Sequence, residues 1–238
     1  MGAGLSLDAV RVDGMTRSVS LTVAVGGLAG VVLPDSATLR RFSDAVVGTG
    51  DGGAGRVTVG GRSRARPDAA GVDGAQPLIG LVTADGGLLP HLSLRENIVF
   101  GRLRAGGGAT PRLVDEADTA AERAGLLMSL DRYPHRATPG QRQQAGFARA
   151  LFRRRPAVIV EDRTGFPRWA GRLDAAAARS GVALLVVTDD RRRLDGFVAA
   201  VDVVDLTSPA ESAAEPVTPG RGRRASGRRH TRRREAAS

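Results

Sequence analysis

Apolar and polar residues alternate in two stretches near the start of the chain. In residues 5–12 and 19–25 most apolar side chains fall on every second position, which is typical of antiparallel strands with one buried face. Several runs further along are almost wholly apolar, and such runs predict strands buried on both faces. These runs cover residues 28–33, 78–82, 157–160 and 183–187, with a more mixed run at 201–206.

Helical periodicity separates these runs. Ser93 and Glu96 have the spacing of a capping box, which marks a helix start. Residues 48–77 are rich in glycine and favour a strand only at 56–60. Short apolar strands that alternate with helices predict a parallel sheet covered on both faces, with ligands at the carboxyl ends of its strands. We expect helices over residues 36–47, 94–104, 112–129, 140–155 and 168–179.

Charge and composition change sharply near residue 207. Residues 207–238 hold 8 Arg and 3 Glu with almost no aliphatic side chains, whereas the first 206 residues hold 27 Arg and 22 acids. A segment of this composition buries too little apolar surface to offset the entropy of ordering. We therefore expect one folded body over residues 1–206 and a disordered arginine-rich tail over 207–238.

Missing residue types exclude several kinds of chemistry. All 35 basic residues are arginine, so Schiff bases, lysine general bases and the lysine of a phosphate-binding loop are excluded. The chain has no cysteine and only three histidines, which excludes disulfides and disfavours a cysteine or histidine metal centre. The sequence has no charged start followed by an apolar core and no apolar run of about 18 residues, so we expect neither a leader nor a membrane-spanning helix. We expect a cytoplasmic protein that can still dock at the inner face of a membrane.

Two segments carry a specific resemblance. Residues 79–98 read IGLVTADGGLLPHLSLRENI, and residues 138–151 read TPGQRQQAGFARAL before the acid-ended run 154–162, RRPAVIVED. They are similar to the Q-loop region, the signature helix and the Walker B strand of ATP-binding cassette (ABC) transporter subunits. A weaker match is LLVVTDD at 184–190, which resembles the switch strand of that family. Order and spacing agree over residues 5–206.

The resemblance implies a fold and two cofactors. The expected architecture is an α/β, P-loop-NTPase-like parallel sheet with helices on both faces. A small antiparallel β subdomain lies at the N-terminus, and a helical subdomain is inserted over about residues 92–150. Members of the family bind ATP and magnesium, so both are possible cofactors here.

The resemblance also places candidate catalytic and metal-binding residues. Asp162 stands where the family has the glutamate that activates water, and Glu161 where it has the magnesium-contacting aspartate. Asp189 stands at the switch histidine position. Taken without the resemblance, Glu161 and Asp162 are more commonly two solvated acids after a strand.

The phosphate loop is the least similar segment. Residues 33–39 read LPDSATL, without glycine or lysine, and Asp35 adds a negative charge that would repel phosphate. Thr38 is the only nucleotide-binding candidate there, and Ala84 replaces the Q-loop glutamine.

The signature segment is better preserved. Thr138, Gly140 and Gln141 are candidates for contacting the phosphate of a partner subunit at a helix N-terminus. By itself, Thr-Pro-Gly-Gln is also an ordinary capped helix start.

These features lead to one main hypothesis and two alternatives. The main hypothesis is an ABC subunit with degraded Walker A, Q-loop and switch motifs. It would be a non-hydrolysing scaffold or regulator paired with a membrane permease or with an active ATPase subunit, as a homodimer or heterodimer. Residues 84–104 would form the permease-coupling surface, which an exposed Phe100 or Arg95 would fit.

One alternative is binding of nucleic acid or anionic lipid through the segment from Arg221 to Arg234. The other is a functional ATPase with atypical motifs, in which Arg40 or Arg41 replaces lysine.

Overall fold

A computed structural model describes most of the folded body. The described residues are 3–50, 53–63, 78–100, 102, 109–162, 170–196, 198–199 and 202–207. They all belong to one compact unit, Met1–Ser208. The predicted disordered tail from residue 208 onward, including the basic segment 221–234, lies outside the described residues.

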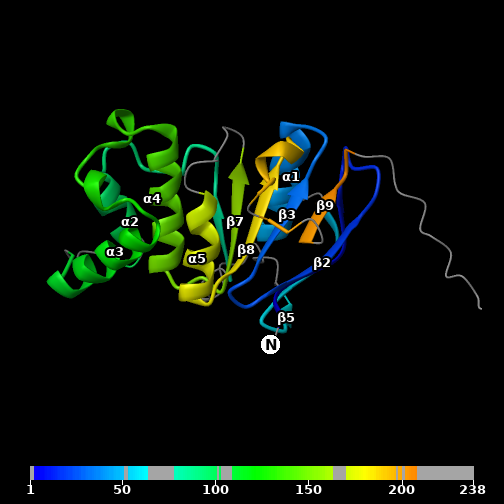
Figure 1. Cartoon of the computed structure of the whole chain (residues 1–238), viewed down its shortest axis with the longest axis horizontal. Coiled ribbons are helices and arrows are strands. Elements are labelled where there is room, and N and C mark those ends of the chain that lie inside the picture. Colours follow the sequence, from blue (N-terminus) through cyan, green and yellow to red (C-terminus); the bar gives the residue numbers. More distant parts are fainter. Residues whose placement is uncertain are drawn as a thin grey trace, which may run out of the picture. The chain divides into compact units, whose positions relative to one another are not determined.

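The central element is a parallel sheet, as the sequence predicts (Figure 1). Each adjacent pair of its strands is parallel, so their carboxyl ends lie at one edge. In order across the sheet, the strands are β6 (Ile79–Val82), β7 (Ala157–Asp162), β8 (Ala183–Thr188), β3 (Leu28–Val32) and β9 (Val203–Asp205).

The two faces of this sheet bury separate hydrophobic cores. Along β7, Val158 and Val160 pack into one core, whereas Ala157 and Ile159 pack into the other. The period of two in a strand directs successive side chains to opposite faces. This explains why β7 and β8 consist largely of apolar residues, and why every residue of both strands is buried.

One core lies between the parallel sheet, helix α1 (Ser36–Val47) and a second sheet. The second sheet is antiparallel, in the order β2-β1-β4-β5. Two of its strands were not fully predicted. β4 begins at Gly53, before the predicted 56–60. β5 has only two residues, both exposed, so its sequence shows no alternation of apolar and polar positions. The strand bounds are β1 (Ala3–Val12), β2 (Val19–Ala24), β4 (Gly53–Val59) and β5 (Arg62–Ser63).

Four helices pack into the other core, and three of them lie together in Figure 1 at one side of the sheet. The bounds are α2 (Leu94–Val99), α3 (Pro111–Arg123), α4 (Pro139–Phe152) and α5 (Ala170–Ser180). The predicted helix over 94–104 is too long, because Phe100 has an extended backbone that ends α2. The predicted helix over 112–129 is wrong in its last part. The left-handed Gly125 (φ +74°) follows the end of α3, and residues 127–129 form a separate 3-10 turn.

Asn97 joins α2 to the loop that precedes it. Its side chain is fully buried, and its Nδ2 donates to the carbonyl oxygens of Leu89, Leu92 and Ser93 at 2.9–3.0 Å. Its Oδ1 accepts from the Leu89 amide at 2.7 Å. One side chain therefore satisfies four backbone groups of a segment that lacks regular structure, and this fixes the path from β6 to α2.

We expect Asn97→Ala to lower the free energy of unfolding by about 2–4 kcal/mol, because several buried backbone groups lose their partner. Urea unfolding monitored by circular dichroism measures the change. Ser93→Ala, which removes only the side-chain cap of the same helix, should cost about 1 kcal/mol. Equal losses in the two variants would show that Asn97 acts only as part of the helix start.

Candidate functional site

The candidate site lies where β3, β7 and β8 end. Parallel strands bring their carboxyl ends to one edge, and the chain leaves β3 there to begin α1. Asp35 directly precedes α1, Glu161 and Asp162 end β7, and Asp189 follows β8. The sheet therefore brings the ends of these strands close to the start of one helix.

Asp35 occupies the N-terminus of α1 with its own carboxylate. Oδ1 accepts from the amides of Ala37 and Thr38 at 2.8 and 2.7 Å, and Oδ2 accepts from the Thr38 hydroxyl at 2.9 Å. These hydrogen bonds, above all that from the Thr38 amide, lower the pKa of Asp35. Free amides and a favourable dipole make a helix N-terminus an anion site. Here the anion belongs to the chain itself.

Thr38, the predicted nucleotide-binding residue of this loop, is fully buried. Its hydroxyl donates to Asp35 and accepts from Nη2 of Arg41 at 3.1 Å. Both functions of the hydroxyl are thus used inside the protein.

Asp189 closes the site from the side of β8. Its Oδ2 accepts from the Ser36 hydroxyl at 2.8 Å, and its Oδ1 accepts from Arg193 at 3.2 Å. The same guanidinium nitrogen of Arg193 donates to the main-chain oxygen of Asp162 at 2.9 Å. Arg193 therefore joins the ends of β7 and β8, and Asp189 joins β8 to α1. The side chain of Asp162 is itself fully buried.

Glu161, the predicted magnesium ligand, faces α1 from β7. Its side chain is 2% exposed, and Arg40 approaches it at 3.7 Å. Burial raises the pKa of Glu161, and the positive charge of Arg40 opposes this shift. Gln143 of α4 donates to the main-chain oxygen of Glu161 at 2.6 Å, so the end of β7 is held from both faces of the sheet.

In the described part of the chain, no group of three or more acidic or histidine side chains is arranged to hold a metal ion. The positive charge that faces Glu161 in this structure is the Arg40 guanidinium, at 3.7 Å.

The signature candidates lie on α4, on the opposite face of the parallel sheet from α1 (Figure 1). Thr138 and Gln141 form a capping box: the Thr138 hydroxyl accepts from the Gln141 amide at 3.2 Å, and the Gln141 Oε1 accepts from the Thr138 amide at 3.0 Å. Thr138 is exposed, and the space beside Gly140 is open. Thr138, Gly140 and Gln141 are therefore close to one another and accessible. Within the described residues no hydrogen bond or ion pair links them to Asp35 or Thr38.

The loop after β6 is held in place by α4. The Arg149 guanidinium donates to the carbonyls of Gly87 and Gly86 at 2.7 and 3.0 Å. Gly86 has a left-handed backbone (φ +83°), and a Cβ there would lie 2.1 Å from the Arg142 carbonyl oxygen. Only glycine allows this close approach. Ala84 precedes this turn and carries no polar side chain.

Sequence reasoning missed two residues of the site. Arg193 lies in a run of three arginines, where nothing distinguishes it from its exposed neighbours. The sequence around Ser36 indicated only a helix start, so the hydrogen bond from its hydroxyl to Asp189 was not predicted. The importance of Asp35 was predicted, but as a charge that repels phosphate; the capping role follows from the preference for Asp just before a helix.

The chain resembles known proteins in sequence over about four fifths of its length. No family model matches the sequence. A "Fe(3+) ions import ATP-binding protein" of Pseudomonas fluorescens is 28% identical over 197 residues, which cover 79% of this chain and 54% of that protein. A "Phosphonates import ATP-binding protein" of Rhodopseudomonas palustris is 28% identical over 198 residues, 79% of this chain and 70% of that protein. The chain thus spans little more than half of the first relative.

Solved structures show the same architecture. CbiO1 of Clostridium perfringens, part of an ABC transporter complex, superposes with a TM-score of 0.63 at 15% identity and 80% coverage of both chains. An ATP-binding cassette of an ABC transporter in its ADP conformation gives a TM-score of 0.66 at 15% identity and 87% coverage of both. The chain has the fold of an ATP-binding cassette. The cassette also resembles, in sequence, the ATP-binding subunits of ABC transporters.

Among the described helices of the cassette, none is long and apolar enough to cross a membrane.

The pKa of Glu161 gives a pH-dependent prediction. Because the folded state raises this pKa, the folded protein binds the proton more tightly than the unfolded chain. The contribution to stability is complete below the unfolded value and is lost as the pH rises through the folded value. We therefore expect Glu161→Gln to gain stability relative to the parent as the pH rises from about 4 to 7.

Urea unfolding at several pH values measures this difference. Glu122→Gln, which removes the same charge from an exposed position of α3, serves as the matched control. A constant difference between Glu161→Gln and the parent at all pH values would contradict the assigned burial effect.

Proposed function

We propose that this cassette is a subunit of an ABC transporter that does not hydrolyse ATP by itself. It acts as a scaffold or regulator at the cytoplasmic face of a membrane permease, beside an active ATPase subunit or a second copy. The observation that carries the proposal is the Asp35 carboxylate at the start of α1, which occupies the amides of Ala37 and Thr38.

Asp35 competes with phosphate in two ways. The two amides cannot serve a phosphate oxygen while they donate to Oδ1, and the Thr38 hydroxyl already donates to Oδ2. Asp35 is also ionised over the physiological range, because the same hydrogen bonds lower its pKa. A phosphate would therefore have to displace a hydrogen-bonded anion and then remain beside its negative charge.

The neighbouring ion pairs support the same conclusion. Arg40 stands against Glu161 at 3.7 Å, and a magnesium ion would have to displace that charge. Asp189 accepts from Ser36 and Arg193, so it offers a carboxylate rather than a donor towards this space. The residues present therefore do not fit magnesium–ATP.

The start of α4 supports a role towards a partner subunit. Thr138 is exposed at the start of α4, and the space beside Gly140 is open. The capping box uses the hydroxyl oxygen of Thr138 as an acceptor, which leaves the hydroxyl hydrogen available as a donor. This surface can complete a nucleotide site that belongs to another subunit.

A second exposed surface supports docking to a permease. The Phe100 side chain at the end of α2 is 45% exposed, and its carbonyl accepts from Arg153 of α4 at 2.8 Å. Arg95, by contrast, is engaged with Asp118 and Asp131. Phe100 thus offers an apolar contact at the end of α2, on a backbone that Arg153 holds.

Titration of magnesium–ATP into the chain tests the proposal. We expect no saturable one-site binding and no magnesium-dependent turnover. Asp35→Gly releases the Ala37 and Thr38 amides, keeps an acceptable residue before the helix, and should produce saturable binding with a Kd at or below about 1 mM. Asp35→Asn removes the charge but keeps a capping acceptor, so it should gain less. Saturable binding and turnover by the parent would instead support a functional ATPase with atypical motifs.

Thr138 gives a second test, in a complex with an active cassette subunit. Thr138→Ala should lower the ATPase rate of the complex by about tenfold or more, because one donor to the partner's phosphate is lost. Thr138→Ser keeps the hydroxyl and the capping box, and should retain most of the rate. Equal rates for the parent and Thr138→Ala would exclude this contact in trans.

A further inference from the structure

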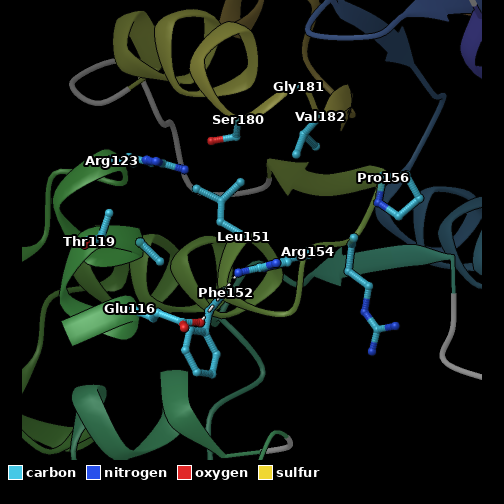
Figure 2. A pocket seen from close by; sticks show the side chains of 12 residues that line it. Glu116, Thr119, Arg123, Leu151, Phe152, Arg154, Pro156, Ser180, Gly181 and Val182 are labelled. Carbon is cyan, nitrogen blue, oxygen red and sulfur yellow. Dashed lines mark ion pairs between the residues drawn. The ribbon is translucent and has the colours of Figure 1, made fainter. Parts of the chain in front are cut away.

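A cavity lies apart from the candidate site, between α3, the end of α4 and the end of α5. Its volume is about 460 Å³, which is within the usual size of small-molecule sites. Figure 2 shows side chains from all three helices around it, including Glu116, Arg123, Arg154 and Ser180. Leu151 and Val182 add an apolar wall. The cavity lies near the amino ends of β7 and β8, whereas the candidate site lies at their carboxyl ends.

Positive charge exceeds negative charge around this cavity. Among the described residues of its lining, Glu116 is the only acidic one, and three guanidinium groups share it: Arg102 at 2.7 Å, Arg112 at 3.2 Å and Arg154 at 3.8 Å. Arg102 and Arg112 lower the pKa of Glu116, the hydrogen bond from Arg102 being the largest cause. One carboxylate cannot neutralise three cations. Arg154 makes the longest of the three contacts, so its charge is the least compensated by Glu116.

Arg154 stands where helices usually end with glycine. It lies two residues after the end of α4 and has a left-handed backbone, with φ +54°. A side chain other than glycine is strained in this conformation, and glycine is the usual residue there. The arginine therefore does not improve the turn. Its side chain is 77% exposed and reaches towards Glu116 across the cavity (Figure 2).

Two donors of the lining have no partner inside the protein. Within the described residues, the Arg123 side chain has no hydrogen bond or ion pair, and the buried Ser180 Oγ has no hydrogen-bond partner. Arg123 comes from the end of α3 and Ser180 from the end of α5. Of these two donors the exposed Arg123 guanidinium can be reached by an acceptor of a ligand.

The helix ends reduce this positive charge without cancelling it. The ends of α3, α4 and α5 all lie at the cavity, and each contributes roughly half a negative charge. Against them stand Arg123 and Arg154 in the lining and Arg102 and Arg112 beside Glu116. After Glu116 is counted, an excess of roughly one to two positive charges remains. A dianion matches that excess.

We propose that this cavity binds a small organic phosphate, a phosphomonoester whose apolar part lies on Leu151 and Val182. Arg123 and Arg154 donate to its phosphate. The ligand joins α3 to the turn between α4 and β7 and to the end of α5, so its binding holds the α2–α4 helices against the parallel sheet. This inference does not depend on the proposed function, since none of these residues belongs to the candidate site.

Phenyl phosphate is the probe, titrated into the full chain at an ionic strength near 0.15 M, where weak surface attraction is screened. Backbone amide shifts of Gly181 and Val182, which line the cavity, report on binding there and not at the arginine-rich tail. We expect saturable shifts of both amides. Benzyl alcohol, which has a similar ring without the charge, should bind at least about tenfold more weakly.

Three substitutions decide the assignment. Arg123→Gln and Arg154→Gly should each weaken phenyl phosphate binding by about tenfold or more, and Arg154→Gly should keep or raise the melting temperature because glycine suits the left-handed turn. The matched control is Arg56→Gln, which removes one charge from an exposed position of β4. It should change the affinity by less than about twofold.

The proposal is overturned by any of three results. The Gly181 and Val182 amides could fail to shift, benzyl alcohol could bind as tightly as phenyl phosphate, or Arg56→Gln could weaken binding as much as Arg123→Gln and Arg154→Gly do.

Discussion

The burial of β7 and β8 on both faces is the constraint on which the rest of the structure depends. Every residue of these strands is buried, so each face of the sheet needs its own cover. Helix α1 and the antiparallel sheet cover one face, and α2–α5 cover the other. Because the side chains alternate between the two cores, a register shift of one residue would exchange them and lose both. The positions of the strand ends, and with them the candidate site, follow from this packing.

The start of α1 shows how one residue can close a helix N-terminus. The dipole and the free amides would accept any anion, and the chain supplies Asp35 at hydrogen-bond distance. An attached carboxylate loses little further entropy on binding, whereas a ligand from solution loses its translational freedom. The internal anion therefore has an advantage that does not depend on its intrinsic affinity. Asp189, Ser36 and Arg193 then connect the surrounding strands around the closed start.

The sequence predicted the elements that have strong local signals. The fully apolar β7 and β8, the capped starts of α2 and α4, and the end of α1 at Gly48 follow directly from periodicity and capping residues. Helix ends without a distinct signal were predicted less well. The helix predicted over residues 94–104 ends at Val99, and no glycine or proline at position 100 marks Phe100 as the end.

The candidate site was predictable only in part. The acids after β7 and β8 could be placed because they follow recognisable strands. Arg193 and Ser36 could not, since their role arises from contacts between segments more than 150 residues apart for Ser36 and Asp189, and 31 apart for Arg193 and Asp162. Local sequence does not specify such pairs. Their partners are chosen by the packing of the sheet.

The closed helix start has an evolutionary consequence. Codons for aspartate and glycine differ by a single base, so one mutation at position 35 would remove the internal anion while the two cores and the capping of α4 stay unchanged. The fold does not depend on Asp35 for its hydrophobic packing. The closure of this helix start therefore depends on one side chain and not on the hydrophobic packing of the protein.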